Sequence, residues 1–268
     1  MVPRSDKMIF ETHAHYEGQE FDADRHELLP ALFKEGIGLI IDVGSSMETT
    51  EKAFLLSKKY KRLFFAAGVH PDSVSELDDE KIEKLRDIAR DRKCLAIGEI
   101  GPDFHYKDDD KLKELQLYWF RRQLDLALEE DLPVIIHSRD AAGVTLDIMK
   151  EYSKKGLRGV MHCYSYSLDQ AKEYVKMGYF LGFGGAVTFK NATKKREIVK
   201  EIPMNSIVLE TDCPYMAPVP VRGSRNDSSN LKYVIEKISE IKGISEKEIE
   251  ERTWENAMEL FSKVKGQI

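Results

Sequence analysis

Four histidines and two acidic residues in this chain have the types and positions of metal ligands. Each stands at or just after the end of a short apolar segment: His13, His15, Glu99, His137, His162 and Asp212. Imidazoles and carboxylates together suit Zn²⁺, Mn²⁺, Co²⁺ or Ni²⁺ better than an ion with oxygen ligands alone, although Mg²⁺ stays among the candidates. Six ligands exceed the needs of one catalytic ion with an open position. We therefore expect two divalent ions per chain, bridged by a carboxylate and able to activate water.

The evidence lies in the whole set, because each residue alone is a weak signal. His13 and His15 are two residues apart in a strand-like segment, so both imidazoles face the same way. A lone histidine is nevertheless more often a hydrogen-bonded structural residue, and Glu99 could pair with a Lys or Arg inside the fold. Six such groups at one end of a fold would be costly to bury without a partner. Taken together, they favour a metal site.

Eight short apolar segments alternate with amphipathic ones along the chain. The apolar segments cover residues 8–12, 38–44, 63–70, 94–101, 133–138, 159–163, 179–185 and 206–212. They are continuously hydrophobic, which is typical of parallel strands buried on both faces. The amphipathic spacing predicts helices over residues 47–60, 79–91, 112–130, 142–154, 168–177, 193–201 and 231–241.

Strands and helices in this order predict an α/β fold, a single TIM-type (β/α)8 barrel with an extra C-terminal helix. An open doubly wound sheet is less favoured, because no GxGxxG follows the first strand. The extra helix is expected over residues 245–262, with Ser245 as N-cap and Glu248 completing a capping box. Residues 8–268 are expected to form one barrel domain, and residues 1–7 a leader or a cloning remnant. In such a barrel the carboxyl ends of all strands meet on one face, where the six candidate ligands would gather.

The composition restricts the possible partners and the compartment. The 268 residues are 42% hydrophobic and carry a formal net charge of −6, so binding to nucleic acid would need a local basic patch. The three cysteines (Cys94, Cys163 and Cys213) form no CxxC pair and are expected to be free thiols in a reducing compartment. No segment is long and apolar enough to span a membrane. A cytoplasmic protein without an obligate protein partner is the expectation.

Several motifs resemble those of the TatD family of metal-dependent deoxyribonucleases, among the amidohydrolase-like barrels. The resemblance runs from Glu11 to Phe261. Its most specific stretch is LETDCPYMAP, followed by RGSRN. The other matching motifs are ETHAH, AAGVHP, GEIGPDF, IHSRDA, HCYS and the terminal N-x-x-x-L-F that begins at Asn256.

The resemblance implies a role for each candidate ligand. His13 and His15 would hold one ion with Asp212, His137 and His162 would hold the other, and Glu99 would bridge the two. Asp212 would also act as the general base that accepts a proton from water.

The resemblance also implies substrate contacts, and it has local departures. His70 would contact substrate or phosphate, with a structural histidine as the alternative. Arg222 and Arg225 suit a phosphate, with a solvated surface pair as the alternative. The chain departs from the family pattern outside the ligands, where the second shell and substrate rim are expected to differ: Glu11 for Asp, Pro102 for Leu, Tyr166 for Gly, and residues 227–229 for Glu-Pro. Tyr166 is expected to narrow the pocket.

Three functions fit these residues. The first is a nuclease that cleaves phosphodiester bonds at single-stranded DNA ends, with the nucleic acid as substrate. The second uses the same metal centre on a C–N or ester bond. The third, which is not enzymatic, is a partner-binding barrel with a relic metal site, and the complete ligand set argues against it. The arginines favour phosphate over the second function but do not exclude it.

Overall fold

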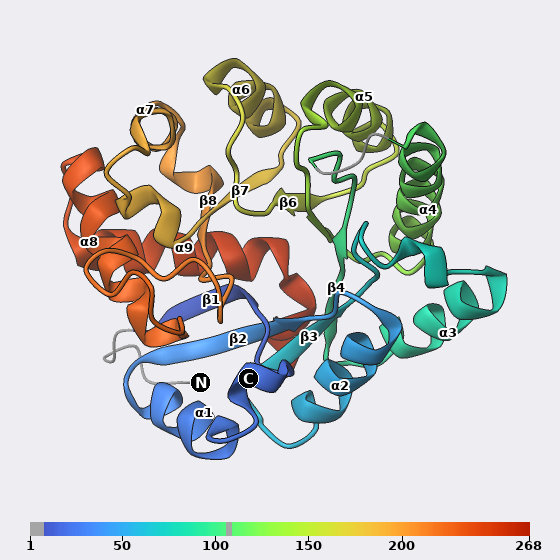
Figure 1. Cartoon of the computed structure of the whole chain (residues 1–268). Helices are drawn as coiled ribbons and strands as arrows, with labels where there is room; N and C mark the ends of the chain where they lie inside the picture. The colour runs from blue at the N-terminus through green and yellow to red at the C-terminus, as the bar shows by residue number, and fades with distance from the viewer. Residues whose placement is uncertain (1–7, 106–108) are drawn as a thin grey trace.

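Eight parallel strands surrounded by helices make up the part of the chain that the computed structural model describes, residues 8–105 and 109–268. The expected leader at residues 1–7 lies outside this part. Each strand pairs with the next one along the chain (Figure 1). The strands are β1 (Ile9–Ala14), β2 (Ile37–Val43), β3 (Leu63–Ala67), β4 (Cys94–Ile100), β5 (Val134–Ile136), β6 (Gly159–Met161), β7 (Phe180–Phe183) and β8 (Ile207–Leu209).

The last strand returns to the first just beyond the end of β8. The backbone N–H of Asp212 donates to the carbonyl of His13 at 3.0 Å, and that of His15 donates to the carbonyl of Cys213 at 2.9 Å. A parallel bridge between Ala14 and Cys213 joins the same two segments. These bonds bring the sheet round to a nearly closed barrel, which confirms the predicted TIM-type fold. They also place three candidate ligands beside one another.

The helices follow the strands as predicted, with one addition. Helix α1 contains Pro30 and has only a weak apolar stripe, so the sequence pattern did not predict it. The helices are α1 (Arg25–Lys34), α2 (Met47–Ser57), α3 (Asp79–Ala89), α4 (Asp110–Glu129), α5 (Ala142–Ser153), α6 (Leu168–Lys176), α7 (Thr193–Glu201), α8 (Leu231–Lys242) and α9 (Glu246–Leu260).

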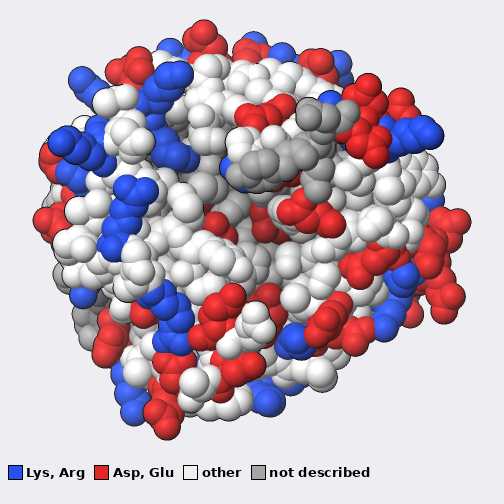
Figure 2. Space-filling model, viewed as in Figure 1, with Lys and Arg blue, Asp and Glu red and all other residues white. Residues whose placement is uncertain are grey.

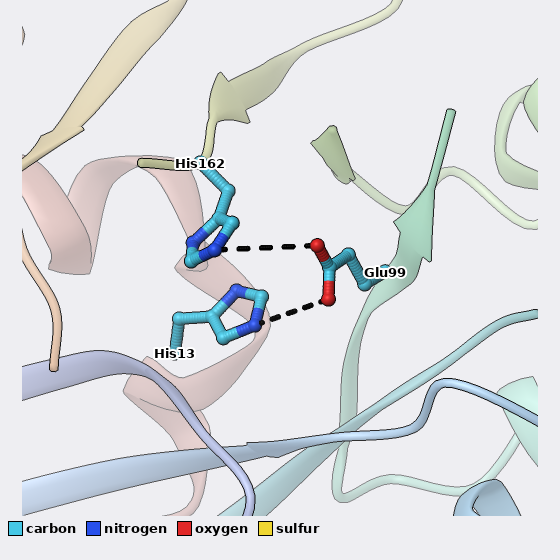
Figure 3. Close-up of side chains that lie close together, drawn as sticks. All are labelled: His13, Glu99 and His162. Atoms are coloured by element: carbon cyan, nitrogen blue, oxygen red, sulfur yellow. Dashed lines mark ion pairs between the residues drawn. The ribbon is translucent and has the colours of Figure 1, made fainter. Parts of the chain in front are cut away.

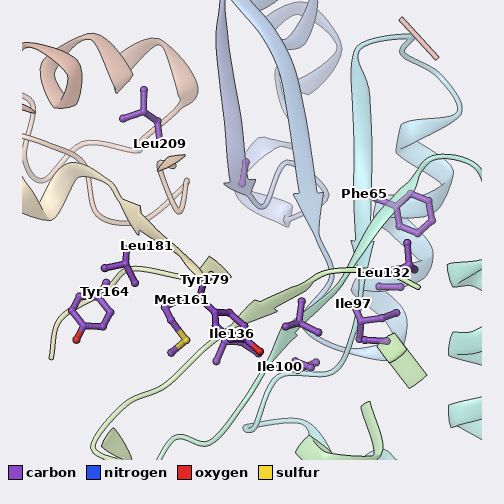
Figure 4. Close-up of a cluster of buried hydrophobic side chains, with 14 of the residues drawn as sticks. Phe65, Ile97, Ile100, Leu132, Ile136, Met161, Tyr164, Tyr179, Leu181 and Leu209 are labelled. Carbon is purple, nitrogen blue, oxygen red and sulfur yellow. The ribbon is translucent and has the colours of Figure 1, made fainter. Parts of the chain in front are cut away.

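Two groups of apolar side chains cover the two faces of the barrel wall. The larger group lies between the strands and the helices, and Figure 4 shows part of it, including Phe65, Ile97 and Ile136. The smaller group contains Phe10 and Ile41 from the strands together with Phe261, which follows α9. The C-terminal helix therefore packs against strand side chains of the smaller group, which accounts for its presence outside the (β/α)8 repeat.

Asn256 fixes helix α9 to the start of the last strand. Its side-chain amide is buried and donates to the carbonyls of Met204 and Ile207, both at 2.7 Å. Asn256→Ala should lower the free energy of unfolding by about 1–3 kcal/mol, because two buried carbonyls lose their partner. Urea denaturation followed by circular dichroism measures this. Asn191→Ala, at an exposed position, should leave the midpoint unchanged; equal midpoints for the two variants would contradict the assigned role.

Candidate metal centre

The six predicted ligands converge at the carboxyl ends of the strands. Glu99 occupies the centre, and its Oε2 lies 3.4 Å from Nε2 of His13. Its other oxygen, Oε1, lies 4.0 Å from Nε2 of His162. Figure 3 shows the two imidazoles on one side of this carboxylate, with the rings of His13 and His162 stacked at a centroid distance of 3.6 Å. The carboxylate thus offers one oxygen to each imidazole.

His13, His15 and Asp212 form one group of convergent ligand atoms. The Nε2 atoms of His13 and His15 are 3.1 Å apart, and Oδ1 of Asp212 lies 3.8 and 3.5 Å from them, respectively. Two ligands that bind one ion at about 2.1 Å are roughly 3–3.5 Å apart in a tetrahedral site. The spacing therefore fits a divalent ion. The other ring nitrogen of His13, Nδ1, is buried and has no hydrogen-bond partner among the described residues.

His137 also contacts Glu99, and His70 packs against His137. Nδ1 of His137 is 2.7 Å from Oε1 of Glu99. The ring of His70 packs edge-on against that of His137, with the centroids 4.3 Å apart. His70, Glu99 and His137 together form a second group whose ligand atoms lie close enough to hold an ion. The structure thus brings His70 to the centre, at a position where a ligand and a substrate contact are both possible.

Three of the candidate ligand histidines have their second ring nitrogen bonded to the protein. Nε2 of His137 lies 2.9 Å from Oδ2 of Asp103, and Nδ1 of His162 lies 2.9 Å from Oε2 of Glu210. Nδ1 of His15 bonds the carbonyl of Val43 at 2.8 Å. Such contacts orient an imidazole and leave its other nitrogen for the ion. Asp103 and Glu210 were not predicted as orienting residues, although both lie in motifs that carry the family resemblance.

The charges at the centre are strongly coupled. Burial alone would raise the pKa of Glu99, but His13 and His137 outweigh it and hold that pKa well below its usual range. Burial would lower the pKa of His137, but Asp103 and Glu99 raise it to about 10. Burial is likewise outweighed at His162, where Glu210 raises the pKa to about 9. In the absence of an ion, protons therefore supply the positive charge that this group of carboxylates requires.

Asp212 is held in an unusual backbone conformation at the rim of the centre. Its φ angle is 59°, in the left-handed region that non-glycine residues rarely adopt. Its carbonyl accepts a bond from the N–H of Tyr215 at 2.9 Å, and its own N–H is bonded to β1. Burial would raise the pKa of Asp212, but His15, His162 and His13 lower it, so the side chain is ionised. An ionised carboxylate next to the ion site can accept a proton.

Two departures from the family pattern meet behind the centre. Glu11 is fully buried, and its Oε1 accepts from the N–H groups of His13 at 3.2 Å and Thr211 at 2.9 Å. Its Oε2 accepts from the hydroxyl of Ser228 at 3.0 Å, and burial raises the pKa of Glu11 to about 8. Glu11 therefore links the ends of β1 and β8, with Ser228 as its partner.

Tyr166, expected to narrow the pocket, has its hydroxyl 2.8 Å from Oγ of Ser138.

A cavity of about 890 Å³ opens above the centre. His15, Glu99, His137, His162 and Asp212 lie in its wall, together with His70. Figure 2 shows the hollow near the middle of this face, with acidic side chains around it. Two cationic side chains line the cavity on the side of β5 and β7: Arg139 follows β5, and Lys195 follows β7.

The structure does not bring the two arginines predicted to bind phosphate into this wall. Arg225 donates to Asp24 at 2.8 Å, and the guanidinium of Arg222 lies 4.2 Å from the centre of the Phe189 ring. Both are near Asp212 in the sequence, but neither is among the described residues that line the cavity.

Comparison with known proteins places the chain in a family. The sequence model of the TatD-related DNases matches residues 10–262. The chain belongs to this TatD-related DNase family. A relative from Bacillus subtilis, named uncharacterized metal-dependent hydrolase YabD, is 40% identical, with 95% of this chain and 99% of that protein covered. With these relatives and its candidate ligand groups, this TatD-family chain is a metal-dependent hydrolase.

Two further relatives extend the comparison. The 3'-5' ssDNA/RNA exonuclease TatD of Cronobacter sakazakii is 30% identical, with 95% of this chain and 98% of the relative covered. A crystal structure of the TatD homologue YjjV from Escherichia coli superimposes with a TM-score of 0.88 at 31% identity, covering 95% of this chain and 98% of that one. Within residues 8–105 and 109–268, this TatD-family chain has no helix long and apolar enough to cross a membrane.

Metal binding to this TatD-family site should release protons. Imidazole ligands must be neutral to bind an ion, and the raised pKa values of His137 (about 10) and His162 (about 9) mean that both carry protons at pH 7. Affinity for Mn²⁺ should therefore rise with pH between 6 and 9. The same protons stabilise the metal-free fold at pH 7, and that contribution is lost as the pH rises through these values.

Calorimetric titrations with Mn²⁺ in buffers of different ionisation enthalpy measure the number of protons released. Asp103→Asn removes the carboxylate that raises the pKa of His137, so fewer protons should be released than in the wild type. Binding enthalpies that do not depend on the buffer would contradict the protonation states inferred for the two histidines.

Proposed function

We propose that this hydrolase cleaves phosphodiester bonds at the ends of single-stranded DNA with water activated by two divalent ions. His13, His15 and Asp212 would hold one ion, His137 and His162 the other, and Glu99 would bridge them. The observation that carries the proposal is the placement of five of these ligands in the wall of a cavity that also contains Arg139 and Lys195. The sixth, His13, is buried with its Nε2 3.4 Å from Oε2 of Glu99. The name of the Cronobacter sakazakii relative supports a nucleic-acid substrate.

The reaction needs a base, a bound phosphate and a positioned water. When bound, the ions would supply Lewis-acid activation of water and of the phosphoryl group. Asp212, ionised and at the rim of the site, accepts the proton of the attacking water. The products are a phosphate monoester and a free hydroxyl. Asp103 and Glu210 orient His137 and His162 for this role.

In this proposal, Arg139 and Lys195 make the phosphate contacts that the sequence predicted for Arg222 and Arg225. Lys195 is half-buried and donates to the carbonyl of Cys163 at 3.1 Å, so its ammonium group is fixed at the edge of the centre. A fixed ammonium close to the ions can stabilise phosphoryl charge. Arg225 is engaged by Asp24 and would have to give up that pair to reach a phosphate.

Metal content and nucleotide release test the proposal together. Protein loaded with Mn²⁺ should hold about two ions per chain by elemental analysis and release mononucleotides from single-stranded DNA. Salt should weaken this activity only modestly, because few phosphates contact the protein at once. One ion or fewer in excess metal would overturn the two-metal assignment. Hydrolysis of amides or lactones, with DNA and RNA ends left intact, would favour the C–N or ester alternative.

Asp212→Asn separates the base from the rest of the site. This substitution keeps the shape of the side chain, and turnover should fall by roughly two to four powers of ten, the usual contribution of a positioned acid or base. Single-turnover rates with saturating Mn²⁺ measure this, alongside elemental analysis of the same sample. Near wild-type turnover with a full metal complement would show that Asp212 is not the base.

A further inference from the structure

The cavity above the metal centre has opposite charge on its two sides. The cations Arg139 and Lys195 come from the segments after β5 and β7. The acidic residues that line the cavity outside the metal centre come from the segments after β1, β2 and β3: Glu17, Glu20, Glu48 and Asp72. Because the strands follow chain order around the barrel, these two sectors face each other across the opening. Figure 2 shows acidic side chains close to the hollow and lysine and arginine side chains to its upper left.

The acidic sector keeps a net negative charge despite one lysine within it. Lys52 lines the cavity, but its ammonium group lies 2.6 Å from Oε1 of Glu48. This pair is neutral, and the exposed carboxylate of Glu20 adds a negative charge beside it. Glu17 lies 3.6 Å from Nδ1 of His15, and Asp72 lies 3.7 Å from Nδ1 of His70. A carboxylate accepts hydrogen bonds from hydroxyl groups and repels a phosphate. The sector therefore suits the sugar end of a nucleotide and disfavours a further phosphate.

Tyr215 provides an exposed aromatic face in this sector. It lines the cavity, is 58% exposed and is bonded through its N–H to the carbonyl of Asp212. Tyr215 follows β8, which is the neighbour of β1 in the barrel. Burial raises the pKa of the Tyr215 hydroxyl, and the nearby negative charge of Glu20 raises it further. Large exposed aromatic side chains in nucleic-acid sites stack on bases. Tyr215 is placed to hold a base between the metal centre and the acidic residues.

We infer that Tyr215 and the acidic sector form a subsite for a terminal nucleoside with a free hydroxyl, which excludes a strand end that carries a phosphate. This inference rests on the proposed nuclease function and specifies its substrate. The scissile phosphate lies at the metal centre, the terminal sugar faces Glu20 and Glu48, and the rest of the strand leaves past Arg139 and Lys195. Cleavage at such a site releases one terminal nucleotide at a time, because the acidic sector leaves no place for the phosphate of a longer product.

Matched oligonucleotides test the inference directly. Single-stranded DNA of one sequence is prepared with hydroxyl or phosphate at the 3' end and, separately, at the 5' end. At the end that the enzyme attacks, the phosphate should lower kcat/KM by roughly tenfold or more, as expected for repulsion from partly exposed carboxylates. The phosphate at the opposite end should have little effect. Raising the salt concentration should reduce the discrimination, because exposed charges are screened.

Charge variants locate the effect in the acidic sector. Glu20→Gln and Glu48→Gln should each reduce the discrimination several-fold, the second also by releasing Lys52 from its ion pair. Lys52→Gln should increase it. Glu251→Gln removes an exposed carboxylate on α9, outside the cavity, and should leave it unchanged. Tyr215→Ala should raise KM roughly tenfold, whereas Tyr215→Phe should leave it unchanged because the ring is kept. On a substrate whose terminal nucleotide lacks its base, the two variants should have the same KM.

The outcomes separate this inference from the function on which it rests. Two results would overturn the subsite while the nuclease function stands. One is equal rates on hydroxyl and phosphate ends. The other is a preference for hydroxyl ends that stays the same in Glu20→Gln and Glu48→Gln. Failure of the metal-loaded protein to release nucleotides from any end would overturn the nuclease function and the subsite together.

Discussion

The carboxylate of Glu99 lies within 4.0 Å of a ring nitrogen of each of four histidines: His13, His15, His137 and His162. These side chains are carried at the ends of β1, β5 and β6, so one carboxylate joins segments from opposite parts of the barrel. A buried carboxylate in this position requires positive charge around it. Protons on His137 and His162 provide it in the metal-free protein, and divalent ions would provide it in the active one.

The barrel makes this arrangement possible and also determines how it is supported. Its carboxyl ends bring the ligands together, and the bonds that close β8 onto β1 run through His13, His15 and Asp212 themselves. Candidate ligands of the site therefore make the backbone bonds that close the sheet. Glu11 strengthens the same junction from behind, with Ser228 in place of the usual family residue there. At the opposite side of the core, α9 packs on strand side chains and is fixed by Asn256.

The order of the strands also governs the charge of the cavity. Loops after β1 to β3 carry carboxylates and those after β5 to β7 carry cations, so a substrate in the opening meets the two kinds of side chain on opposite sides. A chain with a net charge of −6 therefore still presents cations on one side of this cavity. The division follows from the topology and cannot be read from the overall composition.

The sequence alone determined the strand pattern, the barrel and the six candidate ligands, because hydrophobic periodicity and ligand type are local properties. It did not determine Asp103 and Glu210 as partners of His137 and His162, since these contacts span 34 and 48 residues. Proximity along the chain misled at Arg225. The next residue, Asn226, ties this loop back by donating to the carbonyls of Pro214 and Tyr215. Arg225 pairs with Asp24 and does not line the cavity. Which cations and carboxylates line the cavity was decided by the tertiary structure, because the closed barrel, and not distance in sequence, sets which loops face each other.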